Sequence, residues 1–199
     1  MIRQRRMIRA FAPAPIPEDS LDRMLEAALR APSAGFTQGL DLLVLTTRVE
    51  VHNFFAATSD SGFLDDPGEM AGLIDAPVVV VPLADPAAYT ARYAERDKQR
   101  SGLAGVGHEQ WPTPYWLVDA SFAVMSLLLA AVDEGVGALF FRLHREPAAF
   151  FSAFAVPAGR EVIGAVALGH ARDGSVGPRG SPARRPRRSR TEQVHRGRW

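Results

Sequence analysis

Arginine residues gather near both ends of this 199-residue chain. Four of them stand in RQRRMIRAF at residues 3–11, and eight lie beyond residue 178. A guanidinium group binds phosphate through paired hydrogen bonds as well as charge, so arginines brought together from distant segments would form a phosphate clamp. The alternative is a solvated N-terminal arm and a basic tail that holds no ligand.

A polar turn is the second candidate binding element. The sequence APSAGFTQG at residues 31–39 is rich in turn-forming residues. It follows an expected helix whose apolar residues recur at helical spacing. Pro17, Glu18 and Asp19 suit the first turn of that helix, and Pro32 ends it.

Signals for several other chemistries are absent from the sequence. The chain has no cysteine, which excludes disulfides, thiolate metal sites and thiol nucleophiles and fits a reducing compartment. It has no dinucleotide-type glycine turn, P-loop, HExxH motif or serine nucleophile elbow, and its five histidines are scattered singly. We therefore expect no metal site.

Length and composition favour one soluble, well-cored domain, with 47% hydrophobic and 23% charged residues. The basic N-terminus lacks the apolar run of a signal peptide, so the expected location is the cytoplasm. A formal net charge of +1 conceals an acidic body and a strongly basic tail. Nucleic-acid binding through that tail is an alternative function, but the acidic body and the lack of a groove-reading motif argue against it.

Buried strands alternate with helices along the chain, which favours a mixed α/β arrangement. Residues 101–115 are rich in glycine and proline, and we expect a loop or short lid there. Trp111, Tyr115 and Trp116 beside it would either face a substrate or simply pack. The strands are expected at 41–47, 76–83, 137–143 and 161–171, and the helices after the first at 49–58, 86–99, 119–135 and 146–154.

The helix expected at residues 119–135 is the most apolar part of the chain. Between Asp119 and Asp133 it has no charge, glycine or proline, and large apolar residues point all around it. A helix that is apolar on every side must be buried on every side. The uncharged run is shorter than the roughly 20 residues that span a bilayer, so we expect a core helix covered in part by a second subunit.

Five segments in order resemble the nitroreductase family of flavin mononucleotide (FMN) oxidoreductases. They cover the chain almost from end to end, and the likeness is weakest at residues 49–114. The segments are RRMIRAF at 5–11, LEAALRAPSAGFTQG at 25–39, DASFAVMSLLLAAVDEGVGALFF at 119–141, VPAGREVIGAVALGHARD at 156–173 and RRSRTEQVHRGRW at the C-terminus.

The resemblance implies an α+β, three-layer fold with a mixed β-sheet, flanking helices and a long central helix in a homodimer interface. FMN would bind in two clefts lined by both subunits. Residues 1–178 would form the FMN-binding domain. Residues 179–199 would form a basic C-terminal extension that packs on the flavin phosphate or on the partner subunit.

The resemblance also carries over candidate FMN-binding residues from three parts of the chain. The N-terminal basic motif would contact the phosphate and the polar edge of the flavin, and the turn would contact the flavin ring. A basic pair in the tail would close on the phosphate. These residues are Arg5, Arg6 and Arg9, then Ser33, Thr37 and Gln38, and finally Arg187 and Arg188.

The chain departs from the family pattern at several of these positions. Met7 replaces a common Ser, Phe36 a common Asn, and Gly39-Leu40 a common Pro-Trp. Arg142 falls near a position where the family often carries Glu-Gly beside the flavin. It would tune the flavin by stabilising negative charge, select an acidic acceptor, or be a surface residue.

The function that this resemblance implies is hydride transfer from NADH or NADPH, through FMN, to an electron-poor acceptor such as a nitroaromatic or a quinone. Donor and acceptor would use one site in turn, in a ping-pong mechanism. The flavin would carry the chemistry, and no protein nucleophile is needed. The alternative is a protein that stores or senses FMN or a deazaflavin without efficient turnover.

Overall fold

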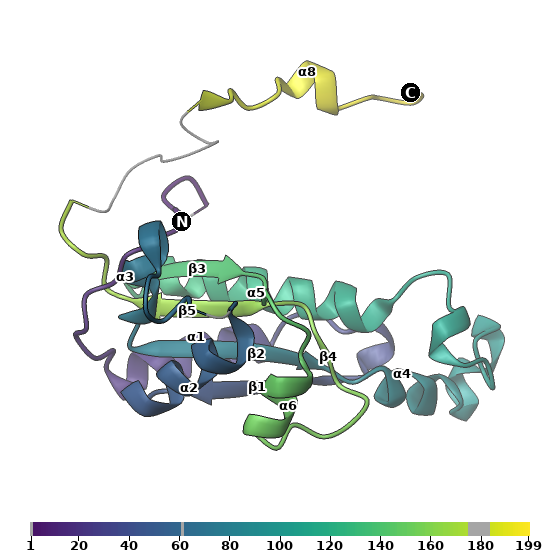
Figure 1. The fold of residues 1–199 in the computed structure, drawn as a ribbon. Coiled ribbons are helices and arrows are strands. Elements are labelled where there is room, and N and C mark those ends of the chain that lie inside the picture. The colour runs from purple at the N-terminus through teal and green to yellow at the C-terminus, as the bar shows by residue number, and fades with distance from the viewer. Residues whose placement is uncertain (1, 61, 175–183) are drawn as a thin grey trace.

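The structure is a computed structural model that describes residues 2–60, 62–174 and 184–199, without the side chain of Glu69. Figure 1 shows the course of the chain. In order, the helices and strands are α1 (Glu18–Leu29), β1 (Leu40–Leu45), α2 (Arg48–Thr58), α3 (Ala71–Ile74), β2 (Val78–Ala84), α4 (Pro86–Tyr93), α5 (Tyr115–Asp133), β3 (Gly137–Phe141), α6 (Ala148–Ala153), β4 (Glu161–Val162), β5 (Ala165–Gly169) and α8 (Arg190–Gln193). Short 3-10 turns lie at Ala34–Phe36, Gly68–Met70, Arg96–Ser101 and His108–Gln110.

The strands form one five-stranded sheet in the order β1-β2-β5-β3, with β4 beside β2. Every pairing between these strands is antiparallel. Outside the strands, Met7 makes an isolated parallel bridge to Ala138 of β3, so the sheet that was expected to be mixed is antiparallel in all its strand pairings. All residues of β2 and β5 are buried, which explains why both read as continuous apolar runs.

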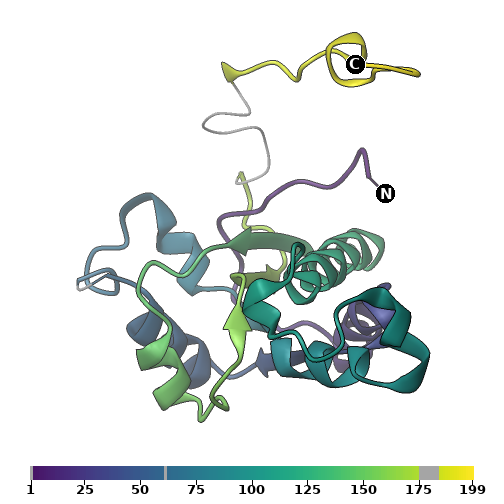
Figure 2. The same ribbon diagram turned by 90° about the vertical axis from the view of Figure 1, so that its right-hand side faces the viewer.

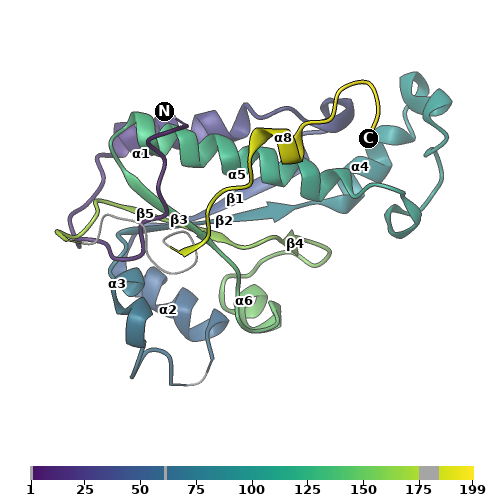
Figure 3. The same ribbon diagram turned by 90° about the horizontal axis from the view of Figure 1, so that it is seen from above.

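Helices cover both faces of the sheet and give three layers. Figures 2 and 3 show α1 and α5 on one face and α2, α3 and α6 on the other. One buried cluster joins α1 and α5 to the sheet, and a second joins α2, α3 and α6 to its opposite face. The predicted α+β, three-layer architecture is confirmed.

The central helix α5 begins at Tyr115, before the expected start at Asp119. Asp119 is therefore not a charged boundary; it is only 7% exposed and lies inside the helix. The helix is long and apolar enough to cross a membrane by length and composition, with a mean hydropathy of 1.8. In this chain it packs on α1 and the sheet, while Phe122 and Met125 remain 47% and 39% exposed.

Two expected strands have different bounds in the structure. The run expected at 161–171 is broken into β4 and β5 at Gly164, whose φ of 144° favours glycine. The strand expected at 76–83 starts at Val78 and continues through Pro82. Val80 pairs with Val166 and Leu83 with Val162, so Pro82 lies opposite the break between β4 and β5. There a missing N–H disturbs the ladder least.

The segment expected as a lid packs on α4 and α5. The helix expected at 86–99 ends as α4 at Tyr93 and continues only as a 3-10 turn. Trp111 and Trp116 are 7% and 6% exposed, and Trp111 packs edge-on against Tyr93. The Trp116 indole N–H donates to Glu161 at 2.9 Å. Packing is therefore the structural role of both tryptophans.

The C-terminal tail stands apart from the three layers in Figures 1 and 2. Its short helix α8 is closed by a capping box between Ser189 and Glu192. Within the described residues, the hydrogen bonds of 184–199 are made inside that segment, including one from Arg188 to the Glu192 carbonyl. The predicted boundary at 178/179 lies outside the described residues, so the expected packing of the extension stays a prediction.

Candidate functional site

The turn that follows α1 holds the candidate residues Ser33, Thr37 and Gln38 in a strained backbone. Phe36 and Gln38 have φ of 57° and 56°, a region that non-glycine residues rarely adopt. The Ser33 hydroxyl accepts a hydrogen bond from the Gln38 N–H at 2.9 Å. The Thr37 hydroxyl donates to the Ala34 carbonyl at 2.6 Å. Local side-chain hydrogen bonds thus fix the turn from within.

Asp119 of α5 ties this turn to the core. One of its carboxylate oxygens accepts from the Ala34 N–H at 2.7 Å and from the Tyr89 hydroxyl at 2.6 Å. Burial, together with the hydrogen bond to Asp119, raises the pKa of Tyr89 above its usual range. Tyr89 therefore stays a neutral donor, and the buried carboxylate has partners that offset its desolvation.

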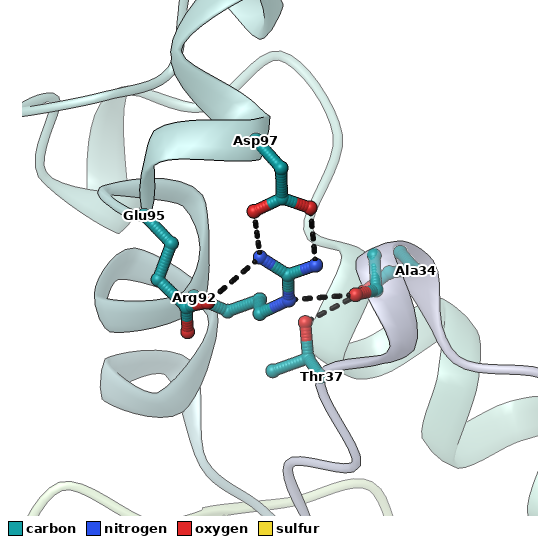
Figure 4. Close-up of polar contacts among 6 residues, drawn as sticks. Ala34, Thr37, Arg92, Glu95 and Asp97 are labelled. Carbon is teal, nitrogen blue, oxygen red and sulfur yellow. Dashed lines mark hydrogen bonds and ion pairs between the residues drawn. The ribbon is translucent and has the colours of Figure 1, made fainter.

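Arg92 of α4 holds the same turn from its other side (Figure 4). The guanidinium Nε–H donates to the Gly35 carbonyl at 2.9 Å. Its two terminal nitrogens each donate to one Asp97 oxygen at 2.7 Å. One of these nitrogens, Nη1, also donates to the Glu95 carboxylate at 3.1 Å. The hydrogen bond from Arg92 lowers the pKa of Asp97 to about 2, so the pair stays charged at neutral pH.

A pocket of about 220 Å³ opens beside the turn. It lies between the end of α1, the turn and α5. Ser33, Gln38, Tyr89 and Asp119 supply polar groups, while Ala28, Leu29, Ala31, Leu40 and Ala123 supply apolar wall. A small apolar pocket with a few convergent polar groups is typical of ligand sites.

The N-terminal arginines are held by the backbone and not by their side chains. The Ile8 N–H donates to the Ala138 carbonyl at 3.0 Å, and the Phe11 N–H donates to the Gly72 carbonyl at 2.9 Å. These bonds fix the segment against β3 and α3. Arg6 donates to the carbonyls of Arg3 and Arg5, and Arg9 is exposed.

Arg5 carries an unpartnered group. Its Nη1 is buried and has no hydrogen-bond partner among the described residues. A buried guanidinium nitrogen without an acceptor costs free energy. An anionic ligand at Arg5 would remove that cost.

The remaining candidates lie elsewhere. Arg142 follows β3 and lines a different pocket, with Phe55, Phe141 and His144. Arg187 and Arg188 are exposed in the tail. Within one chain the described structure does not bring the turn, Arg142 and the tail arginines to one place.

The turn and the N-terminal arginines belong to opposite ends of α5. Asp119 binds the turn near the start of the helix, and β3, which binds the arginine segment, begins just past its end. At 1.5 Å per residue, Asp119 and Asp133 are about 21 Å apart along the axis. Figures 1 and 3 likewise place the N-terminal segment and α4 toward opposite ends of α5.

Sequence reasoning missed Asp119, Tyr89 and Arg92 as residues that position the turn. Asp119 offered a signal, because it is the one acid in the apolar run from Tyr115 to Val132 and a buried charge needs partners. Tyr89 and Arg92 offered none, since both look ordinary on an amphipathic helix.

Comparison with known proteins identifies the class to which this chain belongs. A family model described as "Nitroreductase family" matches residues 2–170, so the chain belongs to the nitroreductase family. A protein of Archaeoglobus fulgidus named "Putative NADH dehydrogenase/NAD(P)H nitroreductase" is 27% identical over 176 residues, covering 87% of this chain and 84% of the relative.

Solved structures share the fold at lower sequence identity. The structure titled "FMN-dependent Nitroreductase" from Clostridium difficile R20291 superposes with a TM-score of 0.68 at 20% identity, and the match covers 100% of both chains. NfrA2 of B. megaterium gives a TM-score of 0.75 at 17% identity, over 100% of this chain and 73% of the other. Family and fold together support an oxidoreductase.

Proposed function

We propose that this protein is an FMN-dependent oxidoreductase that transfers hydride from NADH or NADPH to an electron-poor small molecule, such as a nitroaromatic or a quinone. Membership of the nitroreductase family and the FMN named for a structural relative support this proposal. The observation that carries it is the buried, unpartnered Nη1 of Arg5.

The residues present fit a phosphorylated flavin. Arg5 offers an unsatisfied buried donor to a phosphate, and the exposed Arg9 adds positive charge in the same segment. The described side chains hold no group of three or more His, Asp or Glu placed to bind a metal ion. An organic, phosphate-bearing cofactor therefore suits this chain better than a metal.

Each part of the site has a defined task in this proposal. Arg5 and Arg6 would bind the phosphate, with Arg187 and Arg188 closing on it from the tail, and Arg9 would meet the polar edge of the flavin. The turn with Ser33, Thr37 and Gln38 would orient the ring. FMN supplies the redox chemistry when bound, by accepting hydride from the donor and passing it to the acceptor.

Two subunits are needed to complete this site. About 21 Å along α5 separates the turn from the arginine segment. One flavin ring could not contact both regions of the same chain across that distance. A second copy with its α5 antiparallel to the first would bring the turn of one subunit to the arginines of the other. Phe122 and Met125 lie near the midpoint of α5 and are exposed, as such a twofold contact requires.

One open site that serves donor and acceptor in turn predicts ping-pong kinetics. The nicotinamide would leave before the acceptor binds. Arg9 would favour negative charge near the flavin.

An absorption spectrum of the purified protein is the first test. Bound flavin is expected, and colourless protein that takes up no added FMN would contradict the proposal. The second test is anaerobic addition of NADH and of NADPH to the flavin-loaded protein. Bleaching by either donor supports turnover, whereas no bleaching by both would favour a protein that stores or senses FMN or a deazaflavin.

A further inference from the structure

A second pocket, distinct from the one beside the turn, lies on the other face of the sheet. It has a volume of about 120 Å³ and is formed by α2, the segment leading into α3, and the chain just after β3. Cavities of roughly 150 Å³ with apolar walls take up benzene, so this space suits a single six-membered ring.

The walls of this pocket are aromatic and aliphatic. The rings of Phe55 and Phe141 are stacked with centroids 6.0 Å apart, and Phe63 lies 5.9 Å from Phe55. Met70 and Leu73 complete the apolar lining. A ring placed there would find edge and face contacts with three phenylalanines.

Positive charge stands at the pocket without an acid to neutralise it. It comes from Arg142, which is exposed at the edge of the pocket, and none of the lining residues with a described side chain is acidic. Arg23, Arg92 and Arg160 pair with carboxylates elsewhere, whereas Arg142 makes no ion pair with any described residue. Arg142 thus keeps its bidentate hydrogen-bonding capacity for a ligand.

Ser59 adds a buried polar group to the same pocket. The residue is 7% exposed, and its hydroxyl makes no hydrogen bond with another described residue, so it is available to a ligand in the pocket. A serine hydroxyl can donate to an acceptor oxygen on a ligand.

We propose that this pocket binds a small carboxylic acid with an apolar, single-ring body. The ring lies among Phe55, Phe63 and Phe141, and the carboxylate pairs with Arg142 and accepts a hydrogen bond from Ser59. This proposal gives Arg142 a ligand of its own, and it holds whether or not the protein binds a flavin.

The test uses the purified full-length protein and benzoate as the probe, with benzyl alcohol as a neutral ligand of similar size. Isothermal titration is expected to give benzoate an affinity at least about tenfold higher, because a hydrogen bond to a charged group contributes more than a neutral one. Equal affinity for the two probes would overturn the proposal.

Three variants locate the interaction. Arg142→Gln should lower benzoate affinity about tenfold and leave benzyl alcohol unchanged, and Ser59→Ala should lower it a few-fold. Arg145→Gln is the matched control, because Arg145 is exposed three residues further on and does not line the pocket. An equal effect of the Arg142 and Arg145 substitutions would contradict the proposal.

Methyl-labelled methionine gives a position-specific signal. Met70 lines the pocket, and Met24 is buried in the cluster on the opposite face. Benzoate should shift the Met70 methyl resonance and leave that of Met24 unchanged. The reverse pattern would place the ligand elsewhere and refute the assignment, and neither result depends on flavin content.

Discussion

The turn at residues 33–38 and the arginine segment at residues 5–9 are built in opposite ways. The turn is anchored by side chains, since Asp119 and Arg92 bind its backbone from two sides. The arginine segment is anchored by its backbone on β3, and the Nη1 of Arg5 has no partner within the described part of the chain. The turn is thus held within the chain itself, whereas the arginine segment keeps a donor available for an acceptor from outside the described residues.

Because of this difference, we expect substitutions in the two regions to affect different properties, namely the stability of the fold and the affinity for a ligand. Changes to the anchors of the turn should lower the stability of the chain itself. Changes to the arginine segment should leave stability intact and weaken ligand retention. The variants below test that separation, beginning with the largest expected effect.

Asp119→Ala should destabilise the protein by about 3 kcal/mol, because it leaves the buried Tyr89 hydroxyl and the Ala34 N–H without their acceptor. Urea unfolding followed by circular dichroism measures this loss. Asp133→Ala at the exposed end of the same helix is the control, and a loss no larger than in that control would mean that Asp119 does not anchor the turn.

Phe122→Asp should weaken self-association at least about a hundredfold, since it places a charge in the proposed contact along α5. Sedimentation velocity over a dilution series measures the change, and flavin should be lost together with the dimer. Val49→Asp on α2 is the matched control, because Val49 is 69% exposed and lies on the opposite face of the sheet. A wild-type protein that is monomeric at high concentration would refute the two-subunit site.

Arg5→Ala should lower FMN affinity about tenfold to a hundredfold, while the stability of the flavin-free protein should not fall, because the side chain has no internal acceptor among the described residues. Flavin fluorescence titration and urea unfolding on the same sample give both numbers. Arg3→Ala serves as the control because Arg3 is exposed. Equal flavin content in both variants would exclude Arg5 from the phosphate site.

Arg92→Ala should have the smallest effect, a few-fold loss of flavin affinity through a looser turn. Asp97 reports the same contact, because its pKa of about 2 depends on the hydrogen bond from Arg92. A depressed folded-state pKa stabilises the protein above the unfolded value near 4, and this contribution is lost as the pH falls toward 2.

The Asp97 carboxyl titration can be followed by NMR in wild type and in Arg92→Ala. In the variant the pKa should return toward its ordinary value, and the dependence of stability on pH between 4 and 2 should flatten. Arg92→Lys keeps the charge but loses the bidentate geometry, so it should lower the pKa of Asp97 less than arginine does. A pKa near 4 for Asp97 in the wild-type protein would contradict the hydrogen bond between Arg92 and Asp97.

Most of the fold followed from local patterns. The strands expected at 41–47 and 137–143 and the helix expected at 49–58 lie within a few residues of β1, β3 and α2, because uniform apolar runs leave little choice. The start of α5 was misplaced since Asp119 was treated as a boundary. The break at Gly164 depends on pairing with β2, which local sequence does not reveal.

The candidate site was less accessible to sequence reasoning. Ser33, Thr37 and Gln38 were identified through family resemblance, and the structure places all three in one turn. Ser33 and Gln38 line the pocket beside it, and Thr37 donates a hydrogen bond within the turn. The partners of that turn come from α4 and α5, more than fifty residues further on, and became visible only as hydrogen bonds. Arg142 and Ser59 likewise line one pocket only because the chain after β3 lies beside the end of α2.

The sequence by itself indicated the alternation of strands and helices, the apolar central helix and the supply of arginine at both ends, because these depend on composition and periodicity. The three-layer α+β class was implied by the resemblance to the nitroreductase family. Tertiary structure decided that Asp119 is an anchor and that Arg5 keeps a buried donor free. It also set the turn and the arginines at opposite ends of one helix. Those facts depend on which groups meet across the sheet, and a hydrogen bond between distant segments leaves no mark on either segment alone.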